Sequence, residues 1–228
     1  MKNTVKKLSF RNMNKFGLIG IFAVAGFLMV LAFSYPGNVE TAILKIGKTA
    51  PEKDLQMSDV SGEQVSLKSA AQKNGLLVIF SCNTCPFVIG NGTKSEGWEG
   101  RYPELFDLAS KSDIGMVLVN SNEAKRDNGD SMSDMQKRYT EEGLKGYYAL
   151  DENHKLADAF GALTTPHVFL FDKEMKLIYK GAIDDAVDSS EEVKEAYLNN
   201  AITAYLAGDK IEPNSTKQLG CSIKRVKK

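Results

Sequence analysis

The sequence predicts an α/β fold in which helices flank a central mixed sheet. Two observations carry this prediction. Residues 76–80 and 115–120 are short apolar runs typical of strands buried on both faces, and a segment of helical character follows each run. A hairpin and a final amphipathic segment then close the chain. Strands that alternate with helices and end in a hairpin indicate a mixed sheet packed between helices.

The first half of the domain contains a hairpin, a buried strand and an interrupted helical region. Residues 47–67 read as an irregular opening segment and a hairpin, with the turn at Ser61-Gly62. The buried strand at 76–80 follows and ends beside the first cysteine. The helical region after it is broken by glycines and becomes regular again at 102–109.

The second half continues the alternation and ends on a helix. Four elements come first: a buried strand at 115–120, a helix at 131–142, an extended segment at 147–150 and a short helix at 153–160. Residues 168–171 and 177–179 then read as strands joined by the turn at 172–175. Apolar residues near helical spacing predict a closing amphipathic helix over 190–207.

The first 42 residues are predicted to precede the folded domain. Residues 1–15 form a basic segment that stays cytoplasmic, and residues 16–33 are an unbroken apolar stretch. The stretch is longer than a signal-peptide core of about 7–15 residues and near the lower limit of a membrane span. We interpret it as an uncleaved transmembrane anchor, with a cleaved signal peptide as the alternative. Residues 34–42 are a linker, and the domain with its C-terminal tail occupies 43–228.

Charge excludes one class of partner. The chain has 29 basic and 29 acidic residues, but its first acidic residue is Glu40, so the domain alone is acidic by about five charges. A nucleic-acid-binding domain usually has a basic face, and we therefore expect no nucleic-acid partner. Export past the membrane would place the domain where disulfides persist, so its three cysteines are read as redox groups or structural crosslinks.

Two cysteines, Cys82 and Cys85, lie where the strand at 76–80 ends and a helix begins. A helix N-terminus stabilises a thiolate, and a two-residue spacer lets both sulfurs meet and form a disulfide. We expect Cys82 to be the exposed, attacking thiolate and Cys85 to be the more buried, resolving thiol. With Asn83 as the helix cap, Pro86 falls in the first turn, where proline is tolerated.

Two other interpretations of this pair remain, a structural zinc site and an inert disulfide. Zinc normally needs four ligands, and the remaining candidates, Cys221, His154 and His167, have no ligand-like spacing. Redox exchange is therefore the leading interpretation, and neither a metal nor another cofactor is expected.

Thr165-Pro166 stands directly before a buried strand and is the second half of the candidate site. A cis-proline loop has this pattern, although an ordinary trans turn fits it equally well. In a cis-proline loop, the backbone of the residue before proline can pair with an incoming substrate strand.

The order of elements, from the cysteine pair to Thr165-Pro166 and the final hairpin and helix, resembles the thioredoxin fold. The resemblance implies that Cys82 is the nucleophile, Cys85 the resolving thiol and Pro166 the cis-proline. Three segments are similar to the redoxin branch of this superfamily, which includes alkyl-hydroperoxide reductase and thiol-specific antioxidant proteins: residues 46–67, 177–185 and 220–224. The likeness is to exported bacterial proteins, which implies the cell envelope, with the domain facing the periplasm.

Departures from related families make peroxidase activity less expected than disulfide exchange. Peroxiredoxins place Pro-x-x-x-Thr-x-x-Cys around the peroxide-reactive cysteine. Counted back from Cys85, Cys82 stands at the threonine position and Val78 at the proline position. The thioredoxin acid six residues before the first cysteine is also missing, because Leu76 stands there.

The remaining chemistry-bearing residues have open roles. Cys221 is a candidate relay thiol, an interchain bridge or an inert packed residue. His167 is a candidate accessory group whose positive charge would favour a nearby thiolate. His154 is expected to face solvent, and Asp184-Asp185 to form a solvated acidic turn.

The leading hypothesis is a thiol–disulfide oxidoreductase held at the membrane by its N-terminal segment. Its expected partners are protein thiols or disulfides and an upstream electron donor. A thiol peroxidase is the alternative enzyme. The alternative without catalysis is a copper-binding assembly factor, because copper-delivery proteins of this fold pair two cysteines with a distant histidine and thiolates suit Cu(I).

Overall fold

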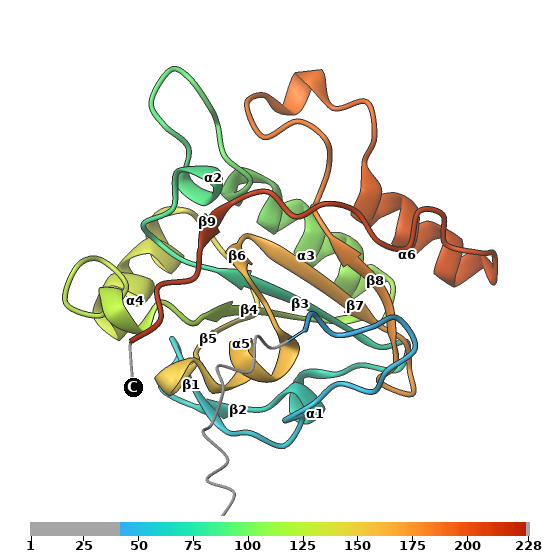
Figure 1. Ribbon diagram of the computed structural model, residues 1–228, viewed down its shortest axis with the longest axis horizontal. Helices are drawn as coiled ribbons and strands as arrows, with labels where there is room; N and C mark the ends of the chain where they lie inside the picture. The colour runs from blue at the N-terminus through green and yellow to red at the C-terminus, as the bar shows by residue number, and fades with distance from the viewer. Residues whose placement is uncertain (1–41, 227–228) are drawn as a thin grey trace, which may run out of the picture. The chain divides into compact units, whose positions relative to one another are not determined.

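A seven-stranded mixed sheet forms the centre of the structure, which is a computed structural model that describes residues 42–226 (Figure 1). The strand order is β2-β1-β5-β4-β3-β7-β8. Strand β3 runs parallel to β4 and antiparallel to β7, so it lies inside the sheet. The strands are β1 (Met57–Asp59), β2 (Gln64–Val65), β3 (Leu76–Ser81), β4 (Gly115–Asn120), β5 (Tyr147–Leu150), β7 (His167–Phe171) and β8 (Leu177–Gly181).

A second, two-stranded sheet joins segments that are far apart in the sequence. It pairs β6 (Thr164–Thr165) with β9 (Cys221–Ser222) in antiparallel register. The helices of the described part are α1 (Leu67–Ala70), α2 (Pro86–Ile89), α3 (Tyr102–Lys111), α4 (Met132–Glu141), α5 (Lys155–Phe160) and α6 (Tyr197–Ala207). Short 3-10 turns occupy η1 (Glu99–Arg101), η2 (Glu123–Lys125), η3 (Glu152–His154) and η4 (Ser190–Glu192).

Helices cover both faces of the sheet, as the sequence predicts. Alternate side chains of a strand point to opposite faces, so Leu77 and Ile79 of β3 pack with α3 and α6, whereas Val78 and Phe80 pack with α1 and α5. The second core contains an edge-to-face aromatic cluster in which Phe160 contacts Phe80 at a ring-centroid distance of 5.4 Å. Complete burial of β3 follows from these two cores and explains its uninterrupted apolar sequence.

Most predicted elements are present, and the final helix begins later than predicted. The hairpin, the buried strands and the helices of the middle region match the expected ranges. Only η4 forms within the predicted start of the helix at 190–207, and α6 begins at Tyr197. The reason is that the amides of Lys194 and Glu195 donate to Asp185 Oδ1, at 2.9 and 3.1 Å, and thereby hold an extended approach to the helix.

The predicted membrane segment at 16–33 lies outside the described residues, as do the basic segment at 1–15 and nearly all of the linker. Within residues 42–226, none of the helices is both long enough and apolar enough to span a bilayer.

Candidate functional site

Three cysteines from distant parts of the chain meet at one end of the central sheet. Cys82 and Cys85 lie in the loop between β3 and α2, and Cys221 lies on β9. In Figure 1, β9 passes between α2 and β6, beside the cysteine loop. The Thr165–Pro166 peptide bond is cis and follows β6 directly, so this loop is the fourth part of the site. All three cysteines are free thiols.

Cys82 is completely buried, contrary to the sequence-based prediction that it is exposed. It packs in the core beneath the site, and its Sγ lies 3.1 Å from Thr165 Oγ1. Its hydrogen bond to Cys85 and its burial raise the pKa of Cys82 well above the ordinary thiol value. Cys82 therefore remains a protonated thiol at neutral pH.

Cys85, rather than Asn83, is the N-cap of α2, and Pro86 occupies the first helical turn as predicted. Asn83 does not cap the helix because its polar groups are engaged elsewhere. Its backbone amide donates to Asp130 Oδ1 at 2.7 Å, and its side-chain oxygen accepts from Tyr148 Oη at 2.8 Å. The expected cap is wrong because these long-range bonds prevail over the local capping preference.

Cys85 is the cysteine whose surroundings favour the thiolate. Hydrogen bonding from the Cys82 thiol is the largest effect, and it opposes the desolvation that burial causes. The Cys221 side chain and amide add to it, and the amide nitrogen lies 3.4 Å from Cys85 Sγ. Together these donors lower the pKa of Cys85 to about 5. The Thr165 carbonyl oxygen, 3.0 Å from the same sulfur, accepts a hydrogen bond from the protonated form.

The Thr165 edge is occupied by the C-terminal tail of the chain. Thr164 pairs with Ser222 and Thr165 pairs with Cys221. A Cβ atom on Gly220 would lie 2.3 Å from the Thr165 carbonyl oxygen, so only glycine fits this close approach without a shift of the strand. The position that the sequence analysis assigned to a substrate strand is thus filled by β9.

Asp130 is a buried acidic residue of the site that the sequence analysis missed. Its Oδ1 accepts from the Asn83 amide at 2.7 Å and from Asn120 Nδ2 at 2.8 Å. Its Oδ2 accepts from Thr84 Oγ1 at 2.7 Å and from Asn122 Nδ2 at 3.1 Å. Asp130 therefore holds the two residues between the cysteines. One sequence signal was present, because Asn120 ends β4, which runs parallel to β3, so both strands deliver polar residues to the same edge.

His167 lies in β7, opposite Phe80, and is almost completely buried. Its ring packs on Phe169 with the centroids 4.4 Å apart. Burial lowers the pKa of His167 to about 3, so the ring is neutral at physiological pH. A positively charged His167 that favours a thiolate receives no support, because burial and the neighbouring charge of Lys180 both lower its pKa. His154 is also buried rather than solvent-facing, with Nδ1 2.8 Å from Asp158 Oδ2.

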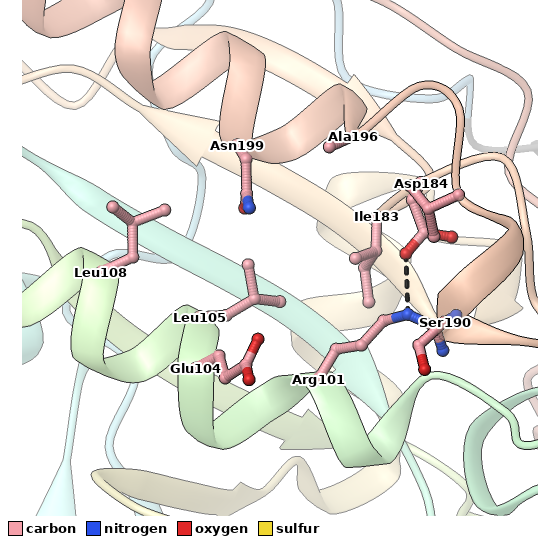
Figure 2. Close-up of a pocket in the computed structure, with 10 residues that line it drawn as sticks. Arg101, Glu104, Leu105, Leu108, Ile183, Asp184, Ser190, Ala196 and Asn199 are labelled. Carbon is pink, nitrogen blue, oxygen red and sulfur yellow. Dashed lines mark ion pairs between the residues drawn. The ribbon is translucent and has the colours of Figure 1, made fainter.

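The predicted solvated turn at Asp184-Asp185 is wrong for Asp184, which is a buried structural junction, whereas Asp185 is exposed. Asp184 accepts from Trp98 Nε1 at 2.7 Å and forms an ion pair with Arg101 at 2.8 Å. Figure 2 shows this pair at the end of a cavity of about 230 Å³ between α3 and α6. None of the three cysteines lines that cavity, so it is separate from the cysteine site.

No group of three or more histidine, cysteine, aspartate or glutamate side chains within residues 42–226 has the arrangement of a metal site. The three cysteines meet, but His167 stacks on Phe169. The copper-binding alternative receives no support from this geometry.

Comparisons with known proteins agree with this fold. The Redoxin family model matches residues 45–198. The crystal structure of an uncharacterized conserved protein from Geobacillus kaustophilus is 28% identical, with a TM-score of 0.72 over 82% of this chain and 95% of that one. A hypothetical protein from Sinorhizobium meliloti is 26% identical, with a TM-score of 0.70 over 81% of this chain and 97% of that one.

A putative protein disulfide isomerase from Bacteroides thetaiotaomicron shares the fold at 17% identity. Its TM-score is 0.52, over 72% of this chain and 92% of that one. No curated protein matches the chain.

Proposed function

This chain belongs to the Redoxin family and is a thioredoxin-like oxidoreductase, and on that basis we propose that it exchanges disulfides with protein thiols through Cys82 and Cys85. One observation carries the proposal: both cysteines lie against the cis Thr165–Pro166 loop, with Cys82 Sγ 3.1 Å from Thr165 Oγ1 and Cys85 Sγ 3.0 Å from the Thr165 carbonyl oxygen. A thiolate is the nucleophile of disulfide exchange, and a second thiol within reach closes the cycle.

The raised pKa of Cys82 and the lowered pKa of Cys85 support roles opposite to those that the sequence resemblance implied. Cys85 attacks a substrate disulfide, one substrate sulfur leaves as a thiolate and takes a proton, and a mixed disulfide with Cys85 remains. Cys82 then attacks Cys85 Sγ, the Cys82–Cys85 disulfide forms, and the second substrate thiol is released. The substrate gains two electrons and two protons. The cysteine pair supplies both electrons and the proton of Cys82, and the second proton comes from solvent because Cys85 reacts as a thiolate.

Cys82 becomes a better nucleophile at the moment it is needed. The largest cause of its raised pKa is the hydrogen bond with the Cys85 sulfur. When Cys85 enters a mixed disulfide it no longer carries a negative charge, so the Cys82 thiol loses that anionic acceptor. Deprotonation of Cys82 therefore becomes easier only after substrate has bound covalently.

The test compares two serine variants in exchange with oxidised glutathione and with a disulfide-bonded peptide. Cys85→Ser removes the thiolate, and because the remaining buried thiol is protonated, we expect the rate to fall at least about 100-fold. Cys82→Ser, made in a Cys221→Ser background so that no second thiol lies beside Cys85, keeps the first step and accumulates a mixed disulfide at Cys85. Exchange at the wild-type rate by Cys85→Ser, or a mixed disulfide on Cys82 alone, contradicts the proposal.

A thiol peroxidase is the second candidate, because Cys85 stands at the peroxide-reactive position of the peroxiredoxin pattern and has a lowered pKa. The hydroxyl that this pattern provides is replaced by the Cys82 thiol. The Thr84 hydroxyl donates to Asp130, so this hydroxyl does not replace the threonine hydroxyl that the peroxiredoxin pattern provides. Rapid mixing of the reduced protein with hydrogen peroxide distinguishes the candidates, since a peroxidase shows a fast oxidation phase that survives in Cys82→Ser.

The proposal includes a location outside the cytoplasmic membrane and an upstream electron donor that re-reduces the cysteine pair. The basic segment at 1–15 and the apolar stretch at 16–33 support this location. Fractionation of cells, with a membrane-impermeant maleimide applied to intact spheroplasts, tests it. Labelling of the tail cysteine only after lysis contradicts a periplasmic domain.

A further inference from the structure

The geometry points to Cys221 as a third redox-active cysteine, which carries the disulfide between Cys85 and the protein surface. This inference rests on the proposed disulfide exchange at Cys85. The C-terminal tail takes the place that a substrate strand would take beside Thr165. Cys221 then lies where a substrate sulfur would meet Cys85.

Backbone pairing at Cys221 and at the residue after it specifies the placement of the cysteine. Cys221 and Ser222 pair with Thr165 and Thr164 in the β6–β9 sheet. The pairing directs the Cys221 amide to Cys85 Sγ at 3.4 Å. Gly220 allows the tail to approach the Thr165 carbonyl more closely than any other residue would.

The residues after Cys221 anchor the tail to the body of the domain. Ile223 is buried in the core that contains α5. The Lys224 amide donates to Asn122 Oδ1 at 2.8 Å, and Arg225 Nε donates to Asp158 Oδ1 at 2.7 Å. A cysteine held between a paired strand and a buried anchor keeps a defined position relative to Cys85.

Exposure distinguishes Cys221 from the other two cysteines. Cys82 is 0% exposed and Cys85 is 3% exposed, whereas Cys221 is partly exposed. The edge of Thr165 on which an external strand would pair is taken by β9. An external thiol or disulfide therefore meets Cys221 before it meets the buried pair.

The transfer balances without any further oxidant. In the oxidised protein, the Cys221 thiol attacks Cys85 Sγ of the Cys82–Cys85 disulfide. The Cys85–Cys221 bond forms, the Cys82–Cys85 bond breaks, and the proton of Cys221 ends on the Cys82 sulfur. This step moves the disulfide toward the surface with no net oxidation.

An external protein dithiol then completes the reduction. Its first thiolate attacks Cys221 Sγ, and Cys85 leaves as a thiolate. Its second thiol attacks the mixed disulfide and releases Cys221 as a thiol, so the external pair is oxidised by two electrons. A sulfur of low pKa is the faster leaving group, and the lowered pKa of Cys85 therefore favours attack at Cys221. The reverse sequence passes electrons to an external disulfide.

Disulfide mapping tests the inference on the whole domain. Cleavage after Lys73, Lys94, Lys217 and Lys224 places Cys82 and Cys85 in peptide 74–94 and Cys221 in peptide 218–224. After oxidation with diamide and blocking of free thiols in acid, we expect the two peptides to be crosslinked. The crosslink persists in Cys82→Ser and is lost in Cys85→Ser and in Cys221→Ser.

A kinetic measurement accompanies the map. Cys221→Ser slows re-reduction of the oxidised protein by an external protein dithiol at least tenfold, whereas the exposed neighbour variant Ser222→Ala keeps the wild-type rate. Two results overturn the inference. The first is an oxidised wild-type protein that holds only the Cys82–Cys85 disulfide, together with re-reduction of Cys221→Ser at the wild-type rate. The second is a crosslink that depends on Cys82. Both leave the proposed function intact, whereas oxidised protein with no disulfide among the three cysteines contradicts the proposed function itself.

Discussion

Thr165 pairs with Cys221 across the β6–β9 sheet, so the cis-proline loop and the C-terminal tail form a single structure around Cys85. The carbonyl oxygen of Thr165 lies 3.0 Å from Cys85 Sγ, and the amide of Cys221 lies 3.4 Å from it on the tail side. The reactive sulfur is thus held between two strands of one small sheet.

Ionisation of Cys85 makes the stability of the reduced protein depend on pH. Its folded-state pKa is about 5, below the ordinary thiol value of 9.0, so its contribution is fully present above the ordinary value and is lost as pH falls toward 5. Cys82 and Cys221 have raised pKa values, so their contributions are lost only as pH rises beyond that range. We expect the melting temperature difference between wild type and Cys85→Ser to shrink between pH 8.5 and 5, and a constant difference contradicts the assignment.

Removal of the Asp130 carboxylate is expected to destabilise the cysteine loop. Asp130→Ala leaves the Asn83 amide and the Thr84 hydroxyl without their acceptor, together with two buried asparagine amides. Unsatisfied buried donors cost about 1–3 kcal/mol each, so for these four donors we expect a total loss of at least about 4 kcal/mol in urea unfolding. The exposed neighbour variant Asp127→Ala is the control and stays within about 0.5 kcal/mol of wild type. Equal effects of the two variants would show that Asp130 does not hold the loop.

Gly220→Ala is expected to loosen the tail. Its added Cβ would meet the Thr165 carbonyl oxygen at 2.3 Å, and because that atom is backbone, β9 must move away. We expect alkylation of Cys85 by iodoacetamide to accelerate about tenfold, since the sulfur loses its cover while the Cys82 donor still favours its thiolate. Gly100→Ala is the matched control, because nothing lies within 4 Å of its Cβ position. Unchanged alkylation in Gly220→Ala would mean that the tail does not control access to Cys85.

His167 is expected to stay neutral throughout the working pH range. Burial lowers its pKa to about 3, so titration of this residue does not change the rate of disulfide exchange between pH 5 and 8. Its protonation on acidification instead costs stability, because the unfolded chain binds that proton at a higher pH than the folded protein does. Imidazole resonances followed by NMR check this directly, and a His167 titration near pH 6.5 in the folded protein is the contradicting result.

Local patterns in the sequence were sufficient for the sheet and for part of the site. Every residue in the apolar run of β3 is buried, as the run predicted. The end of this strand then located Cys82 and Cys85 in the fold. The proximity of Thr165–Pro166 to the cysteines followed from resemblance to a known fold. These features depend on neighbouring residues or on a topology shared with a known fold, and both can be recognised in a sequence.

Long-range pairing accounts for what the sequence did not reveal. Strand β9 has two residues and exists only because it pairs with β6, so no periodicity marks it. The cap at Cys85 depends on a bond between Asn83 and Asp130, which lie on different loops. The exposure of Cys82 was predicted wrongly for the same reason, since packing against Thr165 from a distant segment buries it.

Redox titration of Cys82 and Cys85 in defined glutathione buffers, read by alkylation and mass spectrometry, tests disulfide exchange most directly. We predict one two-electron transition in which both cysteines become protected from alkylation together, and we predict that Cys85→Ser loses this transition. Independent oxidation of the two cysteines, by glutathionylation or to sulfinic acid without a shared disulfide state, would contradict it.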